Sequence, residues 1–91
     1  MAITARIIQV SGKVQGVFYR ASTKDQADAL GILGFVRNEA DGSVYIEAEA
    51  DEAVMNRFID WCRQGPRMAR VDRCDVLEKE PKGFKHFEIR R

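Results

Sequence analysis

The sequence predicts an α+β fold, a ferredoxin-like sandwich in which two helices cover one face of a predominantly antiparallel sheet. Three observations predict it. Strand-like and helical segments follow one another in the order βαββαβ, with a short extra C-terminal strand. One strand alternates apolar and polar residues, as a strand does when one face is covered and the other is solvated. One helix carries a single apolar stripe, which suits packing on a sheet.

The first part of the chain predicts a strand, a glycine-containing loop and a helix. The strand covers about Ala5–Ser11, and the loop covers Gly12–Arg20. We expect the helix over about Ala21–Leu30, since Ser22 lies three residues before Asp25 as in a capping box. The helix should end in a Schellman motif, with the next residue, a glycine, in the left-handed conformation.

A β-hairpin should follow this helix. Its strands are Phe35–Ala40 and Ser43–Ala50, joined by Asp41-Gly42, the strongest two-residue hairpin signal in the sequence. In the second of these strands, alternation assigns the apolar residues to the covered face and the polar residues to the solvated face. The inward set is Val44, Ile46, Ala48 and Ala50, and the outward set is Ser43, Tyr45, Glu47 and Glu49.

The last part of the chain predicts the second helix and two strands. Asp51 should cap the helix, and Gly65-Pro66 should end it. The strands are expected around Arg70–Leu77 and Phe84–Arg90. Right-handed crossovers would place the first and third strands of the chain side by side at the sheet centre. The apolar stripe of the helix, with Trp61 counted as core, is Val54, Met55, Phe58, Trp61 and Cys62.

Length and composition limit the possible functions. The 91 residues suggest one domain, residues 1–91. The formal charge of +1, from 15 basic and 14 acidic residues, provides no broad basic field for nucleic acid. No apolar stretch approaches the length of a membrane span, so we expect a cytoplasmic protein without a membrane partner. We also expect the protein to be a monomer. Cys62 and Cys74 are expected to pack as small apolar side chains and not to form a disulfide.

The loop between the first strand and the first helix is the segment that can bind an anion. Gly12 and Gly16 allow unusual backbone angles, so that successive N–H groups can converge on one point. The helix that follows adds its unpaired N–H groups and its positive dipole end, and Arg20 adds a planar fork for two phosphoryl oxygens. No Lys-Ser or Lys-Thr pair follows the second glycine, so the loop is not a nucleotide-binding Walker motif. From spacing alone, an ordinary strand-to-helix turn with a solvated arginine is slightly favoured over an anion site.

Two motifs resolve this alternative through a resemblance. The first motif comprises Val10, Gly12, Val14-Gln15-Gly16-Val17 and Tyr19-Arg20, and the second comprises Gly34-Phe35-Val36-Arg37-Asn38 and Asp41-Gly42-Ser43-Val44. Together they resemble the acylphosphatase family, and the resemblance extends over nearly the whole chain to the closing Phe87-Glu88-Ile89-Arg90. One departure is Ala50, where the family pattern usually has glycine. We place this residue in the turn before the second helix, away from Arg20.

The resemblance implies hydrolysis of the carboxyl–phosphate anhydride of acyl phosphates, without a metal or a cofactor. By similarity, Arg20 and the loop amides bind the phosphoryl group, and Asn38 holds the attacking water. Phosphate or sulfate should bind the same site. The phosphate-binding residues implied are Gln15, Gly16, Val17, Phe18, Tyr19 and Arg20.

Two other functions compete with this one. The first is RNA binding, since ferredoxin-like sheets can stack RNA bases on exposed aromatic side chains of their strands. Against it, Tyr45 is the only aromatic residue expected on the outer face of the third strand. The chain could instead be an accessory that binds phosphate or carbamoyl phosphate in a larger assembly without hydrolysing it. We expect the remaining polar residues at the surface: His86 on the last strand, Arg37 opposite Asn38, Lys13 beside the loop, and the Glu78–Lys82 stretch as a solvated turn.

Overall fold

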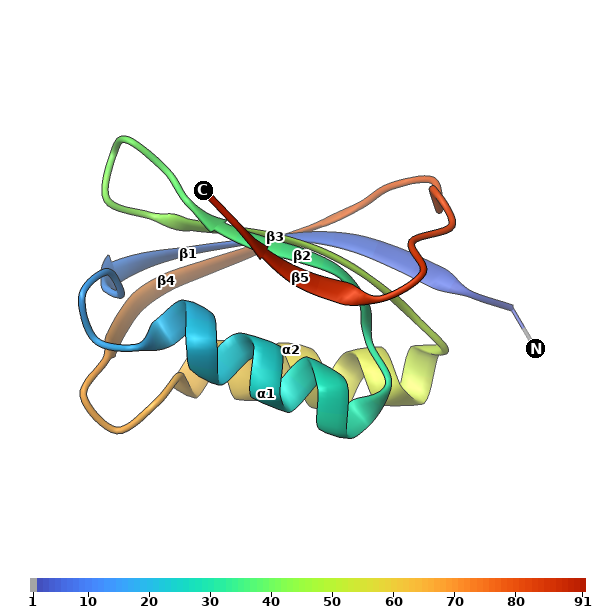
Figure 1. Ribbon diagram of the computed structural model, residues 1–91, viewed down its shortest axis with the longest axis horizontal. Coiled ribbons are helices and arrows are strands. Elements are labelled where there is room, and N and C mark those ends of the chain that lie inside the picture. Colours follow the sequence, from blue (N-terminus) through green and yellow to red (C-terminus); the bar gives the residue numbers. More distant parts are fainter. Residues whose placement is uncertain (1) are drawn as a thin grey trace.

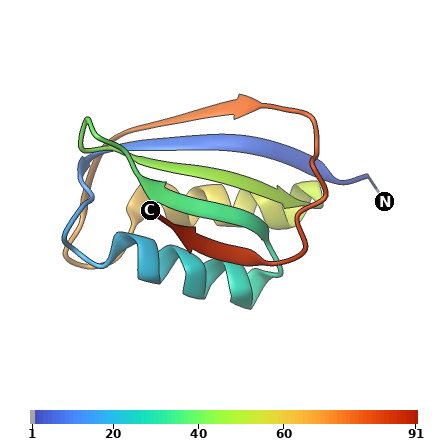
Figure 2. The same cartoon turned by 45° about the horizontal axis from the view of Figure 1, so that its top comes forward.

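The computed structural model describes residues 2–91 and has the predicted order of elements (Figure 1). The strands and helices pack as a two-layer sandwich, with both helices on one face of the sheet (Figures 1 and 2). The expected ferredoxin-like fold is therefore confirmed. The elements are β1 (Thr4–Lys13), α1 (Tyr19–Leu30), β2 (Leu33–Asn38), β3 (Val44–Ala50), α2 (Glu52–Gln64), β4 (Arg70–Glu78) and β5 (Phe87–Arg90).

The sheet has the strand order β4-β1-β3-β2-β5. The first four strands pair antiparallel, and β5 pairs parallel with β2, so that the sheet is mixed at one edge. β1 and β3 are neighbours, as the crossover rule predicts, with Ile8 opposite Ile46. This order places the start of α1 close to the C-terminal ends of β2 and β5 (Figure 2).

The core lies between the sheet and the two helices. Ile8, Val10, Val44 and Ile46 from the sheet and Phe58 from α2 are all fully buried. The stripe of α2 therefore packs inward as expected, but Trp61 is only half-buried at the edge of this cluster. Both cysteines are free, Cys62 buried and Cys74 half-buried.

Helix α1 begins at Tyr19, two residues before the predicted start, and the capping box is wrong. Phe18 precedes the helix in the left-handed conformation, with φ of 64°, and no side chain caps this end. The N–H of Ser22 instead donates to the Phe18 carbonyl as part of the first turn. The other end is as predicted. Gly31 is left-handed, and the next N–H, from Ile32, donates back to Ala27 at 2.8 Å.

The other helix caps agree with the sequence, and the strand boundaries differ by a few residues. Asp51 Oδ1 accepts the N–H of Val54 at 3.0 Å and so caps α2 as expected. β1 continues through a bulge after Ser11 to Lys13, and β2 ends at Asn38 because the hairpin turn begins there. Ala50 is the last residue of β3, not a turn residue.

The outer face of the sheet is covered near Glu47 and Glu49, which contradicts the prediction of a solvated face. The connection between β4 and β5 folds over it. Glu49, 3% exposed, accepts the N–H groups of Lys82, Gly83 and Phe84. Glu47 accepts the Tyr45 hydroxyl and pairs with the Lys79 ammonium at 3.1 Å. The Glu78–Lys82 stretch is thus partly tied down and is not a solvated turn.

The surface assignments of Arg37, His86 and Lys13 hold in part. Lys13 and His86 are exposed, and the imidazole lies 3.6 Å from the Glu88 carboxylate. Arg37 does lie on the outer face, but its guanidinium packs over the Tyr45 ring, 4.6 Å from the ring centre, and the side chain is half-buried.

Candidate active site

The anion loop, defined here as residues 14–18, joins β1 to α1. Gly16 and Phe18 both adopt positive φ, 75° and 64°. A phenylalanine in this region is strained, and such strain is typical of functional segments. Among residues 2–91, no acceptor is found for the backbone N–H groups from Gln15 to Arg20. The loop therefore presents free donors directly before the N-terminus of a helix, which is the arrangement that binds anions.

Tyr19 anchors this loop to the core. Its hydroxyl donates to the Cys62 carbonyl at 2.6 Å, and its ring lies 5.6 Å from that of Trp61. Burial, followed by the neighbouring Cys62, raises the pKa of Tyr19, so that the hydroxyl stays protonated and remains a donor. Gly65 passes so close that a Cβ there would lie 2.8 Å from the Tyr19 ring. The first turn of α1 is consequently held in place by the contacts of Tyr19 with Cys62 of α2 and with Gly65.

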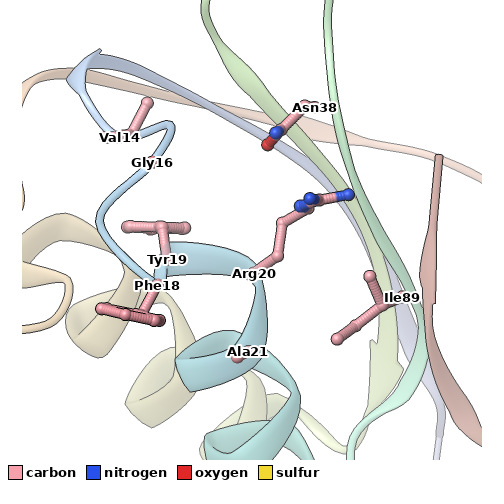
Figure 3. Close-up of a pocket in the computed structure, with 8 residues that line it drawn as sticks. All are labelled: Val14, Gly16, Phe18, Tyr19, Arg20, Ala21, Asn38 and Ile89. Atoms are coloured by element: carbon pink, nitrogen blue, oxygen red, sulfur yellow. The ribbon is translucent and has the colours of Figure 1, made fainter.

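Arg20 lies on the first turn of α1 and extends toward the end of β2 (Figure 3). Its Nη1 donates weakly to the Arg90 carbonyl at 3.4 Å. Within the described part of the chain, no carboxylate lies within 4.0 Å of this guanidinium. The donors of its planar fork are thus available to an anion from outside the protein.

Asn38 is the last residue of β2 and faces the same cavity (Figure 3). Strand alternation places it on the same face as Val36, which is the face covered by the helices. Its Oδ1 is buried, and no hydrogen-bond partner is found for it among residues 2–91. Buried side-chain oxygens are almost always bonded, so an orphan acceptor at a cavity indicates a position where a donor belongs.

Arg20 and Asn38 line one cavity of about 310 Å³ (Figure 3). Loop residues form its floor, and Ile89 of β5 projects into it from the side opposite the loop. The site thus combines a cation, free N–H donors and one free acceptor with an apolar wall. The lining residues are Val14, Gly16, Phe18, Tyr19, Arg20, Ala21, Asn38 and Ile89.

Most of the predicted site residues meet at this cavity, and two do not line it. Val17 is buried in the core, 6% exposed. The Gln15 side chain turns to the β2–β3 hairpin, where its amide donates to two carbonyls. Ile89 was missed as a lining residue because its place depends on the pairing of β5 with β2, which residue patterns do not reveal. Its position in the closing segment of the family resemblance was an available signal.

The described residues hold no group of three or more His, Cys, Asp or Glu side chains arranged to bind a metal. Neither helix in this part of the chain has the length and apolar character needed to cross a membrane.

Comparison with known proteins determines the family. The Acylphosphatase family model matches residues 6–89. The chain belongs to the acylphosphatase family. The acylphosphatase of Gloeobacter violaceus is 46% identical over 84 residues, which cover 92% of this chain and 90% of that protein. Like its relatives, the chain is an enzyme that hydrolyses acyl phosphates to carboxylate and phosphate.

Solved structures of acylphosphatases share the fold. The acylphosphatase of Coxiella burnetii superimposes with a TM-score of 0.93 at 32% identity, over 97% of this chain and 93% of that one. The acylphosphatase of Bacillus subtilis gives 0.92 at 33% identity, over 99% of this chain and all of that one. Because each superposition covers nearly all of this chain, the similarity includes the loop between β1 and α1 and the β5 edge of the sheet.

Proposed function

We propose that the phosphoryl group of the acyl phosphate binds between Arg20 and the anion loop, and that Asn38 orients the attacking water. One observation carries this proposal: a cation without a carboxylate partner and an acceptor without a donor face the same cavity. Among residues 2–91, no carboxylate lies within 4.0 Å of the Arg20 guanidinium, and no donor is found for the buried Oδ1 of Asn38. An anion satisfies the first group, and a water molecule satisfies the second.

The phosphoryl group fits the donor side of the cavity. Free loop N–H groups and the positive end of the α1 dipole favour negative charge there. The Arg20 fork can donate in parallel to two phosphoryl oxygens. These groups also stabilise the charge that spreads over the equatorial oxygens during phosphoryl transfer. Binding and electrostatic stabilisation thus come from the same residues.

Asn38 fits the water. Its Oδ1 can accept a hydrogen bond from a water molecule and direct the water oxygen at phosphorus. As the water oxygen bonds to phosphorus, the bond from phosphorus to the acyl oxygen breaks, and the carboxylate leaves with its electron pair. The proton of the water passes to a phosphate oxygen. Because a carboxylate is a good leaving group, the step needs positioning more than acid catalysis, and we propose that it proceeds without a metal or a cofactor.

We further propose that the enzyme works as a monomer on a small molecule. The loop, Arg20, Asn38 and Ile89 all come from one chain, so that a second copy is not needed to complete the site. A nucleic-acid function has less support. The aromatic rings of the outer face, Phe35 and Tyr45, are covered by the guanidinium groups of Arg90 and Arg37, at 4.1 and 4.6 Å from the ring centres. This leaves little open ring surface for base stacking.

Arg20→Lys tests the phosphoryl site, with hydrolysis of benzoyl phosphate as the assay. Lysine keeps the charge but cannot offer two parallel donors, so we expect kcat/KM to fall by about 10²-fold or more. Inorganic phosphate should inhibit the unchanged enzyme competitively and raise its Tm, and the variant should lose both effects. Arg57→Lys, at an exposed position on α2, is the matched control and should behave as wild type.

Two results would contradict the proposal. Near wild-type kcat/KM in Arg20→Lys would remove the guanidinium from the phosphoryl site. Activity lost on treatment with EDTA and restored by a divalent metal would show that the reaction depends on a metal ion.

A further inference from the structure

We infer that the side chain of Gln15 is a positioning residue, which sets the place of Asn38, and of the water it holds, relative to the anion loop. The inference rests on the proposed function, because it assigns to Gln15 a part in the same water-orienting step. It concerns the side-chain amide, which is bonded to the β2–β3 hairpin, and not the backbone N–H of this residue.

The Gln15 amide joins the loop to both sides of the β2–β3 hairpin. Its Nε2 donates to the Glu39 carbonyl at 2.9 Å and to the Ser43 carbonyl at 2.9 Å. A primary amide carries two N–H groups, so these two bonds use both of them. One carbonyl directly follows Asn38 in the chain, and the other directly precedes β3. A single side chain therefore spans the base of the hairpin.

The hairpin carbonyls are otherwise engaged only within the hairpin. The N–H of Glu39 donates to the Ser43 carbonyl at 2.8 Å, and the N–H of Gly42 donates to the Glu39 carbonyl at 3.2 Å. Each oxygen then has a second lone pair, and the Gln15 amide occupies it. Within residues 2–91, these are the hydrogen bonds that connect residues 14–18 with the turn after Asn38.

The position of this link explains its effect on catalysis. Gln15 is adjacent to Gly16, which lines the phosphoryl end of the cavity, and Glu39 is adjacent to Asn38, which lines the water end. The link thus connects the phosphoryl end and the water end of the cavity through residues that are each adjacent in the chain to a residue lining it. A shift of about 1 Å between reacting groups can cost about 10²-fold in rate. Loss of the link should therefore lower kcat even though Gln15 contacts neither water nor substrate.

Gln15→Met is the test variant, because methionine keeps the length of the side chain and lacks both donors. We expect kcat for benzoyl phosphate to fall by about 10- to 100-fold, while the inhibition constant of inorganic phosphate changes less than about threefold. Gln9→Met is the matched control. Gln9 donates to the same hairpin residue, at the Ser43 hydroxyl, but it lies on β1 and not on the loop. This control should keep wild-type kcat.

A double-mutant cycle with Asn38→Ala separates positioning from a general loss of structure. If Gln15 acts through Asn38, then Gln15→Met should lower kcat by less than about threefold once Asn38 is already alanine. An equal fall in both backgrounds would overturn the inference, as would loss of phosphate affinity in parallel with kcat. Wild-type kcat in Gln15→Met would also overturn it. If Asn38→Ala alone leaves kcat unchanged, the proposed role of Asn38 itself fails, and this outcome is distinct from the others.

Discussion

Replacement of Asn38 by alanine separates catalysis from stability more sharply than any other single change. Among residues 2–91, Oδ1 of Asn38 has no hydrogen-bond partner, so its removal breaks no hydrogen bond at that atom within this part of the chain. The side chain is only half-buried, so that little packing is lost with it. We therefore expect the free energy of unfolding to change by less than about 1 kcal/mol, with Tm within about 8 °C of wild type.

The effect on the rate should be large. Loss of one well-placed polar group that acts in the transition state costs about 10²–10³ in kcat elsewhere, or about 2.7–4 kcal/mol. Because Asn38 is assigned to the water and not to the phosphoryl group, KM and the inhibition constant of phosphate should change little. The variant should thus lower kcat and kcat/KM together.

The assay is steady-state hydrolysis of benzoyl phosphate with thermal melting on the same preparation. Asn56→Ala, at an exposed position on α2, is the control for loss of an asparagine and should behave as wild type. A variant at Asn38 that melts more than about 8 °C below wild type and turns over normally would refute the reasoning. Asn38 would then support the end of β2, and another group would have to hold the water.

Three further predictions concern the parts of the fold that hold the site and the sheet. Tyr19→Phe removes the buried bond to the Cys62 carbonyl and should lower the free energy of unfolding by about 1–2 kcal/mol in urea melts; an unchanged midpoint would show that this bond does not anchor the loop. Glu49→Gln removes the charge that accepts three backbone N–H groups and should cost about 2–3 kcal/mol. The kcat per folded molecule should not change, because Glu49 pairs with Ala5 near the start of β1 and the anion loop follows the other end of that strand; a stable variant with altered kcat would contradict this. Burial alone would raise the pKa of Glu47, but the Tyr45 hydroxyl and the Lys79 ammonium outweigh burial and lower it, so that the stability from this carboxylate is present above its unfolded pKa and is lost as the pH falls through the folded value. Chemical denaturation between neutral and acidic pH should therefore show a flatter pH dependence for Glu47→Gln than for wild type, and parallel curves would contradict the assignment.

Local sequence signals explain most of the helices and strands, and they explain the part of the site formed by the loop and Arg20. The Asp51 cap and the left-handed Gly31 depend on neighbours a few residues away, and both appear where they were expected. The hairpin turn includes Asp41-Gly42 but is wider than the two predicted residues, since β2 ends at Asn38 and the Gly42 N–H donates to the Glu39 carbonyl. The proposed anion loop was predictable for the same reason, since Gly16 acts through its own backbone and Arg20 follows the loop directly in the chain, on the first turn of α1. The start of α1 was wrong because the Ser22 capping box is also a local signal, and the anchoring of Tyr19 by α2 overrode it.

The sequence by itself thus determined the order of strands and helices, the apolar face of β3 and α2, and the loop that can bind an anion. Tertiary structure alone decided three features. The connection before β5 buries Glu47 and Glu49 on a face that alternation assigns to solvent, because Glu49 accepts backbone N–H groups of this connection and Glu47 pairs with its Lys79 ammonium. The parallel pairing of β5 with β2 brings Ile89 into the cavity. The Gln15 amide bridges to carbonyls 24 and 28 residues away. The physical reason is common to all three. Partners far apart in the chain meet only when the sheet has assembled, so neighbouring residues in the sequence do not predict which groups will bond to each other.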